Sequence, residues 1–307
     1  MDYAALPAVI IYCILIIVGT AGNASLIYAT VVNKKLHHAT NLIIASQAVA
    51  DIAYLVSHLV VIIEIIENRT SIPFIQCFKH TFVSNVAINF SVMISLFVAL
   101  DRLLCVAFPF WYMRVKKCAY LIIAYTVTLI WSIPITWLTE VFTDAYTIVN
   151  CSLVGIYQGS LKFIWRGTIF VTNCLTLAIY VFIYRYVKLQ QGEVQKKKLL
   201  KSLLIMASMT TPSRFFLTVV VMIPEFIPMS DRETFLLMIY VRAFVSFSIS
   251  TNYFVLYSCS ADYRSALRQQ LGLKPRQVVP AKTRKVSTRD RLNDATNFSP
   301  PKTNLTP

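Results

Sequence analysis

Seven long apolar stretches, separated by short polar connections, occupy nearly everything before Ser260. Each stretch reaches or exceeds the roughly 20 residues that a helix needs to cross about 30 Å of hydrocarbon. Polar side chains within such spans need partners on neighbouring helices, so we predict that the helices pack as one bundle. The predicted fold is an all-α membrane protein, a seven-transmembrane helix bundle. The predicted spans are residues 7–32, 41–66, 77–104, 119–141, 161–187, 199–224 and 235–258.

A shorter amphipathic stretch follows the last predicted span. From Ala261 to Leu271, apolar and basic residues alternate at helical spacing, and Gly272 ends the pattern. We predict a short eighth helix along the inner leaflet, where its bases meet anionic membrane lipid. Residues 1–271 then form one membrane domain with its juxtamembrane helix. Residues 272–307 are rich in Pro, Thr, Ser, Asn and Arg, which predicts a disordered cytoplasmic tail.

Composition and charge support a membrane location and predict its orientation. Hydrophobic residues make up 57% of the chain and charged residues 14%, against roughly 25% charged in soluble proteins. Lys and Arg gather in alternate connections and in the tail. The positive-inside rule therefore predicts a multi-pass plasma-membrane protein with its N-terminus outside and its C-terminus in the cytosol. The net charge of +15 then reflects topology, and bases spread over several loops argue against binding of nucleic acid.

The cysteines and sequons are interpreted through this orientation. Of seven cysteines, only Cys77 and Cys151 lie at the oxidising outer face and away from helix interiors. We predict a disulfide between them, with two free thiols as the alternative. Sequons at Asn68 and Asn150 are predicted glycosylation sites on the same side. Cys259, on the inner side, is either palmitoylated or an unmodified thiol.

A motif at the inner end of the third span carries a family resemblance. Leu100-Asp101-Arg102-Leu103-Leu104-Cys105-Val106 is followed by Phe108-Pro109-Phe110-Trp111-Tyr112, and Cys77 stands 25 residues before Arg102. Further matches are Gly22-Asn23, Ala50-Asp51, Trp131, Pro134, Tyr184, Tyr257 and Asp262-Tyr263-Arg264. Across residues 7–271 the chain resembles rhodopsin-like (class A) G-protein-coupled receptors. The run of residues around Asp101, together with Asn252-Tyr253, is most similar to nematode serpentine chemoreceptors of class sx.

The resemblance implies a receptor that senses an extracellular small molecule or peptide and activates a heterotrimeric G protein. Asp101 would hold Arg102 until activation frees it, and Tyr184 and Tyr257 would then receive the guanidinium group. Anchoring at the membrane interface is the alternative role of both tyrosines. Arrestin is a further implied partner, through phosphorylation of the tail.

Asp51 is a carboxylate in the middle of the second span, so it should face the bundle interior and find partners there. The resemblance implies that it holds a sodium ion, the one cofactor considered. A protonated Asp51 bonded to neighbouring amides is the alternative. The residues of this predicted polar cluster are Asn23, Asp51, Ser91, Ser250 and Asn252.

Arg214 and Arg242 are the basic residues deepest in the predicted membrane, which makes them candidates for a ligand pocket. Their guanidinium groups match the geometry of a carboxylate on a ligand or peptide. Internal ion pairs with Glu64, Glu140 or Glu225 are the alternative. Helix faces and family position add eight further pocket residues. These are Ser84, Asn85, Ile88, Trp165, Thr172, Phe215, Ala243 and Phe247.

Three departures from the family pattern concern the last two spans. Thr211-Pro212-Ser213-Arg214 replaces the usual Trp-x-Pro, and Pro212 predicts a kink. Asn252-Tyr253 replaces the usual Asn-Pro, which leaves open how that helix unwinds. The sixth span also brings no clear carboxylate partner for Arg102, which predicts measurable basal signalling.

Other functional classes find less support in the sequence. An enzyme needs a nucleophile with its base, paired acids or a metal cluster, and the four histidines join none of these. A transporter or channel with seven helices remains the alternative function. However, the chain shows no pair of matching interrupted segments in its two halves, the usual mark of inverted repeats.

Overall fold

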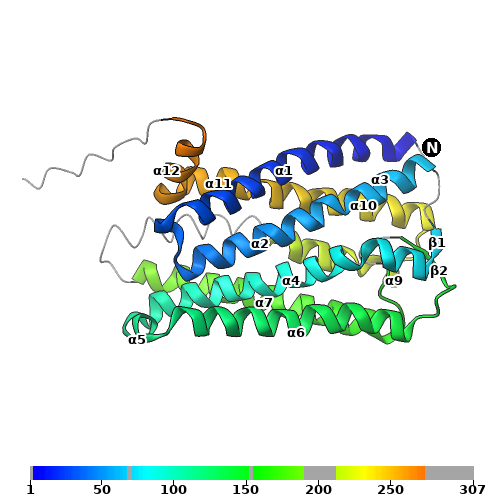
Figure 1. Cartoon of the computed structure of the whole chain (residues 1–307). Helices are drawn as coiled ribbons and strands as arrows, with labels where there is room; N and C mark the ends of the chain where they lie inside the picture. The colour runs from blue at the N-terminus through cyan, green and yellow to red at the C-terminus, as the bar shows by residue number, and fades with distance from the viewer. Residues whose placement is uncertain (1–2, 68–70, 152–154, 190–211, 274–307) are drawn as a thin grey trace, which may run out of the picture. The chain divides into compact units, whose positions relative to one another are not determined.

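The computed structural model describes residues 3–67, 71–151, 155–189 and 212–273. Residues 1–273 form one unit, built from long helices that run side by side (Figure 1). The predicted tail, residues 272–307, lies outside the described residues from Lys274 onward. The longer helices are α1 (Leu6–Val32), α2 (Ala39–Val56), α3 (His58–Glu67), α4 (Phe74–Ala107), α6 (Lys117–Phe142), α7 (Gly159–Leu189) and α10 (Asp231–Ser250). The shorter elements are η1 (Tyr3–Ala5), η2 (Lys34–Leu36), β1 (Ser71–Pro73), α5 (Pro109–Arg114), β2 (Ile148–Asn150), α9 (Ile223–Phe226), α11 (Asn252–Cys259) and α12 (Ala261–Gln270).

Six of the described helical segments are long and apolar enough to cross a membrane, in agreement with six of the predicted spans. They are Leu6–Val32, Ala39–Glu67, Phe74–Ala107, Lys117–Phe142, Gly159–Leu189 and Arg232–Cys259. The remaining prediction, residues 199–224, falls largely outside the described residues, and its described part is helical from residue 212 to residue 220. The predicted kink at Pro212 falls at the first residue of this described part. The architecture is the predicted all-α bundle.

The surface of the bundle suits a lipid solvent. Ile17 and Val83 are each 70% exposed, and Ile130 is 67% exposed. By contrast, Asp51 and Asn89 are buried in the interior. Large apolar side chains on the outside and satisfied polar groups within are expected where no water is available to solvate them.

Two of the predicted spans are interrupted by a hydroxyl residue. Ser57 separates α2 from α3, and its Oγ donates to the Tyr54 carbonyl at 2.6 Å. Thr251 separates α10 from α11, and its Oγ1 donates to the Ser248 carbonyl at 2.7 Å. Side-chain hydrogen bonds of this kind compete with the backbone ladder and bend helices. The second interruption lies directly before Asn252, where the sequence left the local helix geometry open.

A short two-stranded sheet and a disulfide close one end of the bundle. β1 and β2 pair antiparallel, with Ser71 opposite Asn150. One residue past this register, Cys151 is bonded to Cys77 of α4, with a Cα–Cα distance of 5.4 Å. The predicted disulfide is therefore present. Of the two sequons, Asn68 lies outside the described residues and Asn150 belongs to β2.

The predicted eighth helix is α12, at the opposite end of the bundle from β1 and β2 (Figure 1). Ser260 caps it by accepting from the Tyr263 amide at 3.4 Å. Tyr263 and Leu267 are buried against α1, and the Tyr263 hydroxyl lies 3.1 Å from Thr30 Oγ1. Gly272 ends the turn with a positive φ of 67°, a conformation that glycine adopts without strain.

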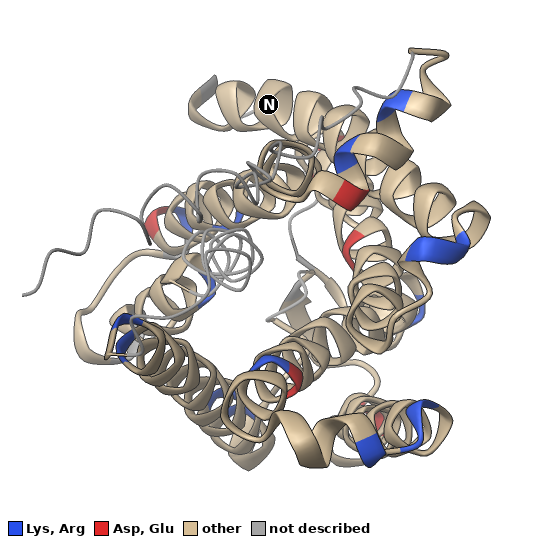
Figure 2. Ribbon diagram, turned by 90° about the vertical axis from the view of Figure 1, so that its left-hand side faces the viewer, with Lys and Arg blue, Asp and Glu red and all other residues tan. Residues whose placement is uncertain are grey.

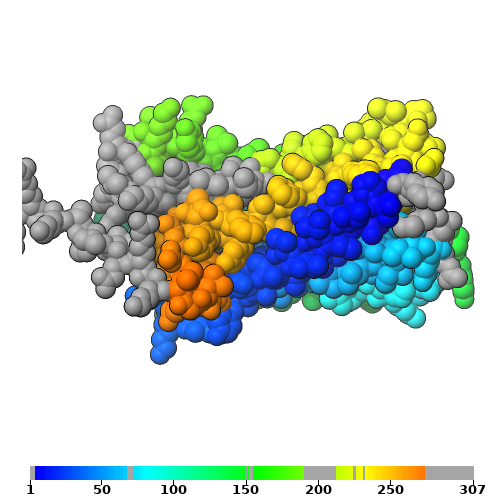
Figure 3. Space-filling model, turned by 90° about the horizontal axis from the view of Figure 1, so that it is seen from above, coloured from blue at the N-terminus to red at the C-terminus, as the bar shows by residue number. Residues whose placement is uncertain are grey.

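Close backbone contact seats α1 on the rest of the bundle. Figure 3 shows α1 lying along the surface beside α10 and α11. A Cβ atom added at Gly19 would collide with Ser250 Oγ and lie 2.6 Å from Leu55 Cδ1. One added at Gly22 would lie 2.9 Å from Tyr253 Cβ. Small residues thus allow helices to approach where the hydrophobic effect does not press them together.

We predict opposite effects for two glycine substitutions. Gly19→Ala should lower the free energy of unfolding by about 1–3 kcal/mol, because the contact with Ser250 has no spare room. Gly167→Ala is the matched control, since a Cβ there meets nothing within 4 Å. It should leave stability unchanged or raise it by up to about 1 kcal/mol, through helix propensity. Thermal unfolding of the detergent-purified proteins measures both, and equal shifts would contradict the packing argument.

Candidate functional site

A cavity with about 690 Å³ of empty space, open space at its mouth included, lies among the helices. Five helical segments contribute to its wall, which is mainly apolar but contains four charged side chains. The lining residues are Asp51, Tyr54, Ile88, Ser91, Val92, Trp165, Arg166, Ile169, Arg214, Leu217, Thr218, Val221, Arg242, Val245 and Ile249.

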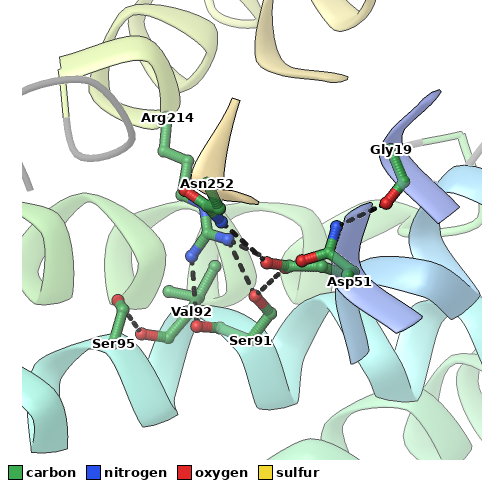
Figure 4. Close-up of polar contacts among 8 residues, drawn as sticks. Gly19, Asp51, Ser91, Val92, Ser95, Arg214 and Asn252 are labelled. Atoms are coloured by element: carbon green, nitrogen blue, oxygen red, sulfur yellow. Dashed lines mark hydrogen bonds and ion pairs between the residues drawn. The ribbon is translucent and has the colours of Figure 1, made fainter. Parts of the chain in front are cut away.

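An ion pair between Asp51 and Arg214 forms one side of this cavity (Figure 4). Arg214 Nη2 lies 3.3 Å from Asp51 Oδ1 and donates to Ser91 Oγ at 2.7 Å. Arg214 Nη1 donates to the Ser91 carbonyl at 3.1 Å. Ser91 Oγ in turn donates to Asp51 Oδ1 at 2.7 Å, and Asn252 Nδ2 donates to Asp51 Oδ2 at 3.4 Å. The pair is thus embedded in hydrogen bonds, as a buried charge requires.

This geometry does not fit the sodium ion expected at Asp51. The Arg214 guanidinium already supplies a positive charge to the carboxylate, and it uses the Ser91 oxygens that an ion would need. Ser250 Oγ donates to the Ser246 carbonyl at 2.8 Å, away from Asp51. Asn23 Nδ2 donates to the Gly19 carbonyl at 2.9 Å, and Asn23 lines a small second cavity with Asp51 and Asn252. Asn23, Asp51, Ser91 and Asn252 therefore come together as predicted, but Asp51 and Ser91 contact an arginine that we expected to meet a ligand or other carboxylates.

A second polar network fixes the aromatic wall of the cavity. Trp165 Nε1 donates to Asn89 Oδ1 at 2.8 Å, and Asn89 Nδ2 donates to the Tyr157 hydroxyl at 2.8 Å and to Thr136 Oγ1 at 3.1 Å. The rings of Tyr157 and Trp165 stack with centroids 4.3 Å apart. Burial raises the pKa of the Tyr157 phenol to about 12, so it remains protonated at neutral pH. The network connects α4, α6 and α7 to the segment that follows the disulfide, and sequence reasoning missed Asn89, Thr136 and Tyr157.

Four of the ten predicted pocket residues line the cavity. They are Ile88, Trp165, Arg214 and Arg242. The other six lie elsewhere. Three are polar and bond within or between helices: Ser84 donates to the Ala53 carbonyl, Asn85 to the Thr81 carbonyl and Thr172 to Met93 Sδ. The other three are apolar: Phe215 packs on Phe170, Ala243 packs against α1 and α3, and Phe247 is 56% exposed. These positions were inferred from helix faces, and a modest error in helix rotation moves a side chain from the cavity to a neighbouring interface.

The Asp101–Arg102 pair lies at the far end of α4, near α5. Asp101 is fully buried and accepts hydrogen bonds from Thr40 Oγ1 and, at 2.7 Å, from the Tyr112 hydroxyl. Arg102 Nε lies 3.7 Å from Asp101 Oδ2. Burial, together with the Asp101 charge, raises the pKa of the Tyr112 phenol above its ordinary value, so Tyr112 donates at neutral pH. The sequence predicted the pair but not the two hydroxyl groups that hold it.

The tyrosines predicted to receive Arg102 do not contact it in this structure. Tyr184 is 53% exposed, and Tyr257 stacks on Tyr253 with ring centroids 6.3 Å apart. Tyr180, one helical turn before Tyr184, is buried, and the Arg102 charge acts on its hydroxyl. Tyr180 and Tyr184 are four residues apart on α7, so they lie on the same face of the helix, one turn from each other.

These features define a class of protein: a serpentine membrane protein with a cavity among its helices and an Asp-Arg pair at the far end of α4. The chain matches the family model for the serpentine type 7TM GPCR chemoreceptor Srsx over residues 16–271. It therefore belongs to this family of chemoreceptors. A comparison with individually curated proteins gives no match.

We predict strong coupling between Asp51 and Arg214. Asp51→Asn and Arg214→Gln should each lower the free energy of unfolding by about 3–5 kcal/mol, because each leaves one buried charge without its partner. The double substitution should lose clearly less than the sum, since neither charge then remains. Thermal or chemical denaturation of the four purified proteins measures these free energies and so completes the double-mutant cycle.

Asp144→Asn is the matched control, because it makes the same chemical change at an exposed carboxylate. It should change stability by less than about 1 kcal/mol. Additive losses in the Asp51 and Arg214 cycle would show that the two charges do not stabilise each other.

Proposed function

We propose that this chemoreceptor binds an extracellular ligand in the cavity and responds by activating a heterotrimeric G protein at the Asp101–Arg102 end. The single observation that carries the proposal is that α4 contributes to both places. Ser91 and Val92 line the cavity, and Arg102 lies ten residues further along, roughly 15 Å at the rise of an α-helix. One continuous helix therefore connects the two sites.

The orientation proposed for signalling places the disulfide and the two-stranded sheet outside. A disulfide is stable in the oxidising exterior, and Lys and Arg gather in the opposite connections and the tail. Figure 2 views the bundle from the end that holds α5 and α12, where Lys and Arg occur on several helices. Basic residues at this end suit contact with anionic lipid, through α12, and with cytosolic partners. Arrestin binding to the tail remains part of this proposal.

Activation requires that the ligand prefer one of two receptor states. The segment after residue 212 contributes Arg214, Leu217, Thr218 and Val221 to the cavity wall. A ligand that contacts this wall can therefore favour one position of the segment over another. We propose that its movement opens the cytosolic end, where Arg102 leaves Asp101 and contacts the G protein. Tyr184 and Tyr257 remain the tyrosines proposed to receive Arg102 in the active state, and Tyr180 of the same helix is a third candidate.

Substitutions at the Asp101–Arg102 pair test the coupling step. Arg102→Gln should reduce ligand-stimulated nucleotide exchange on a G protein by at least about tenfold, while surface expression is kept. Asp101→Asn should raise exchange without ligand, because it removes the carboxylate that holds Arg102. Tyr112→Phe removes only one hydrogen bond of Asp101, so it should raise exchange without ligand by a smaller amount. The expected shift is about 1 kcal/mol in the equilibrium between the inactive and active receptor states.

The same reconstituted receptor should be assayed for solute flux into liposomes, which separates a receptor from a transporter. Exchange without flux supports the proposed function. Flux that persists without any G protein, together with absence of exchange across the candidate G proteins, would contradict it.

Epitope tags at the two termini test the orientation. We expect a tag at Met1 to be accessible to antibody on intact cells, and a tag at Pro307 to be accessible only after permeabilisation. Seven crossings place the termini on opposite sides. Labelling of both tags on intact cells would contradict the proposed topology.

A further inference from the structure

Two buried polar groups of the cavity wall, on different helices, lack partners that would satisfy them. Arg242 of α10 is 4% exposed and lines the cavity. Its Nε donates to the Met238 carbonyl at 3.0 Å, one turn earlier on the same helix. Among the described residues, no ion pair within 4.0 Å and no further hydrogen bond involves its guanidinium group. An arginine buried at membrane depth without a counter-charge is costly unless something else supplies one.

The second group is the Tyr54 hydroxyl of α2. Tyr54 is 1% exposed and lines the same cavity. Its hydroxyl forms no hydrogen bond of ordinary geometry with the described residues, although the Ser246 hydroxyl, which bonds His58 and the Arg242 carbonyl, lies nearby. Arg242 and Tyr54 belong to different helices and line one cavity, so both can donate to an acceptor bound in it.

Neither nearby carboxylate supplies that acceptor. Asp51 is committed to Arg214, Ser91 and Asn252. Glu64 of α3 lies within the field of Arg242, but within the described part of the chain its two oxygens accept no hydrogen bond and form no ion pair within 4.0 Å. Glu64 is also absent from the cavity wall. The expected alternative, an internal pair of Arg242 with Glu64, is thus not formed.

The surroundings of the two donors are apolar. Tyr54 packs with Leu55, Val245 and Ile249, and the cluster is extended by Ile88 and Leu217. Of these, all but Leu55 line the cavity. A molecule bound beside these two donors would therefore meet an apolar surface next to a few polar groups, the usual design of a selective small-molecule site, while Asp51, Arg166 and Arg214 lie elsewhere on the wall.

We infer that the ligand of this cavity is a small carboxylic acid with an apolar body, whose carboxylate accepts hydrogen bonds from Arg242 and Tyr54. The planar guanidinium matches a carboxylate in shape and charge, which a neutral alcohol or amide cannot reproduce. The apolar body lies against Ile88, Leu217, Val245 and Ile249. This inference rests on the proposed function only in taking the cavity as the ligand site, and it specifies the chemistry of the ligand.

Binding to the full chain tests the inference without any G protein. The probes are matched pairs of octanoate with 1-octanol, and 4-phenylbutanoate with 4-phenylbutanol, added to receptor in lipid nanodiscs. We expect at least one acid to raise the unfolding temperature of the receptor in a saturable manner. The matching alcohol should have a dissociation constant at least about tenfold higher. Equal binding of acid and alcohol, or binding of neither acid, would overturn the inference.

Variants then place the carboxylate. Arg242→Gln should weaken binding of the acid by about 10- to 100-fold and leave binding of the alcohol unchanged. Arg242→Lys should recover part of the loss, since it restores charge without the planar fork. Tyr54→Phe should weaken binding of the acid by about 3- to 10-fold. It serves as the second variant if Arg242→Gln fails to fold.

Lys79→Gln is the charge-matched control, because Lys79 is exposed and does not line the cavity. It should leave binding of both probes unchanged. A loss equal to that of Arg242→Gln would assign the effect to overall charge and overturn the inference. Nucleotide exchange is measured separately: acid binding without exchange would contradict the proposed function alone, whereas exchange driven only by neutral compounds would contradict the inference alone.

Discussion

The buried ion pair between Asp51 and Arg214 is the constraint on which the interior of this receptor depends. A carboxylate and a guanidinium at membrane depth are each costly alone, so the segments that carry them must meet. Ser91 and Asn252 complete the arrangement and bring α4 and α11 to the same point. Pairs of this kind add little stability over an apolar replacement, and their value here is that they admit only one register of the surrounding helices.

The character of the cavity follows from that constraint. Because Asp51 already balances Arg214, it cannot also balance Arg242, and the cavity wall remains positive next to an apolar surface. The opposite end of α4 shows the reverse arrangement. There a carboxylate, Asp101, is satisfied several times over, and Arg102 is its most distant partner at 3.7 Å. The cavity is thus prepared to accept an anion, whereas Asp101 at the end of α4 holds a cation weakly enough to release it.

Much of the fold could be predicted from the sequence, because a bilayer imposes a length and an apolar composition on every span. The disulfide and the amphipathic α12 followed from topology and periodicity in the same way. The pairing of Asp51 with Arg214 could not be predicted, since it depends on how two helices are rotated toward each other. The network around Asn89 was missed for a similar reason: its members are ordinary polar residues that become informative only when three helices and a loop place them within 3.1 Å.

The position of Arg214 connects these observations to signalling. Arg214 lies on the segment that we propose to move, whereas Asp51 and Ser91 lie on α2 and α4. Movement of that segment must therefore break or stretch an ion pair in a medium of low dielectric constant, where the energy of separating charges is large. An anion bound beside Arg242 adds negative charge to the same cavity and offers Arg214 a competing partner. A carboxylic acid would thus weaken the restraint in proportion to its own binding, which is how differential affinity for two states becomes a conformational response.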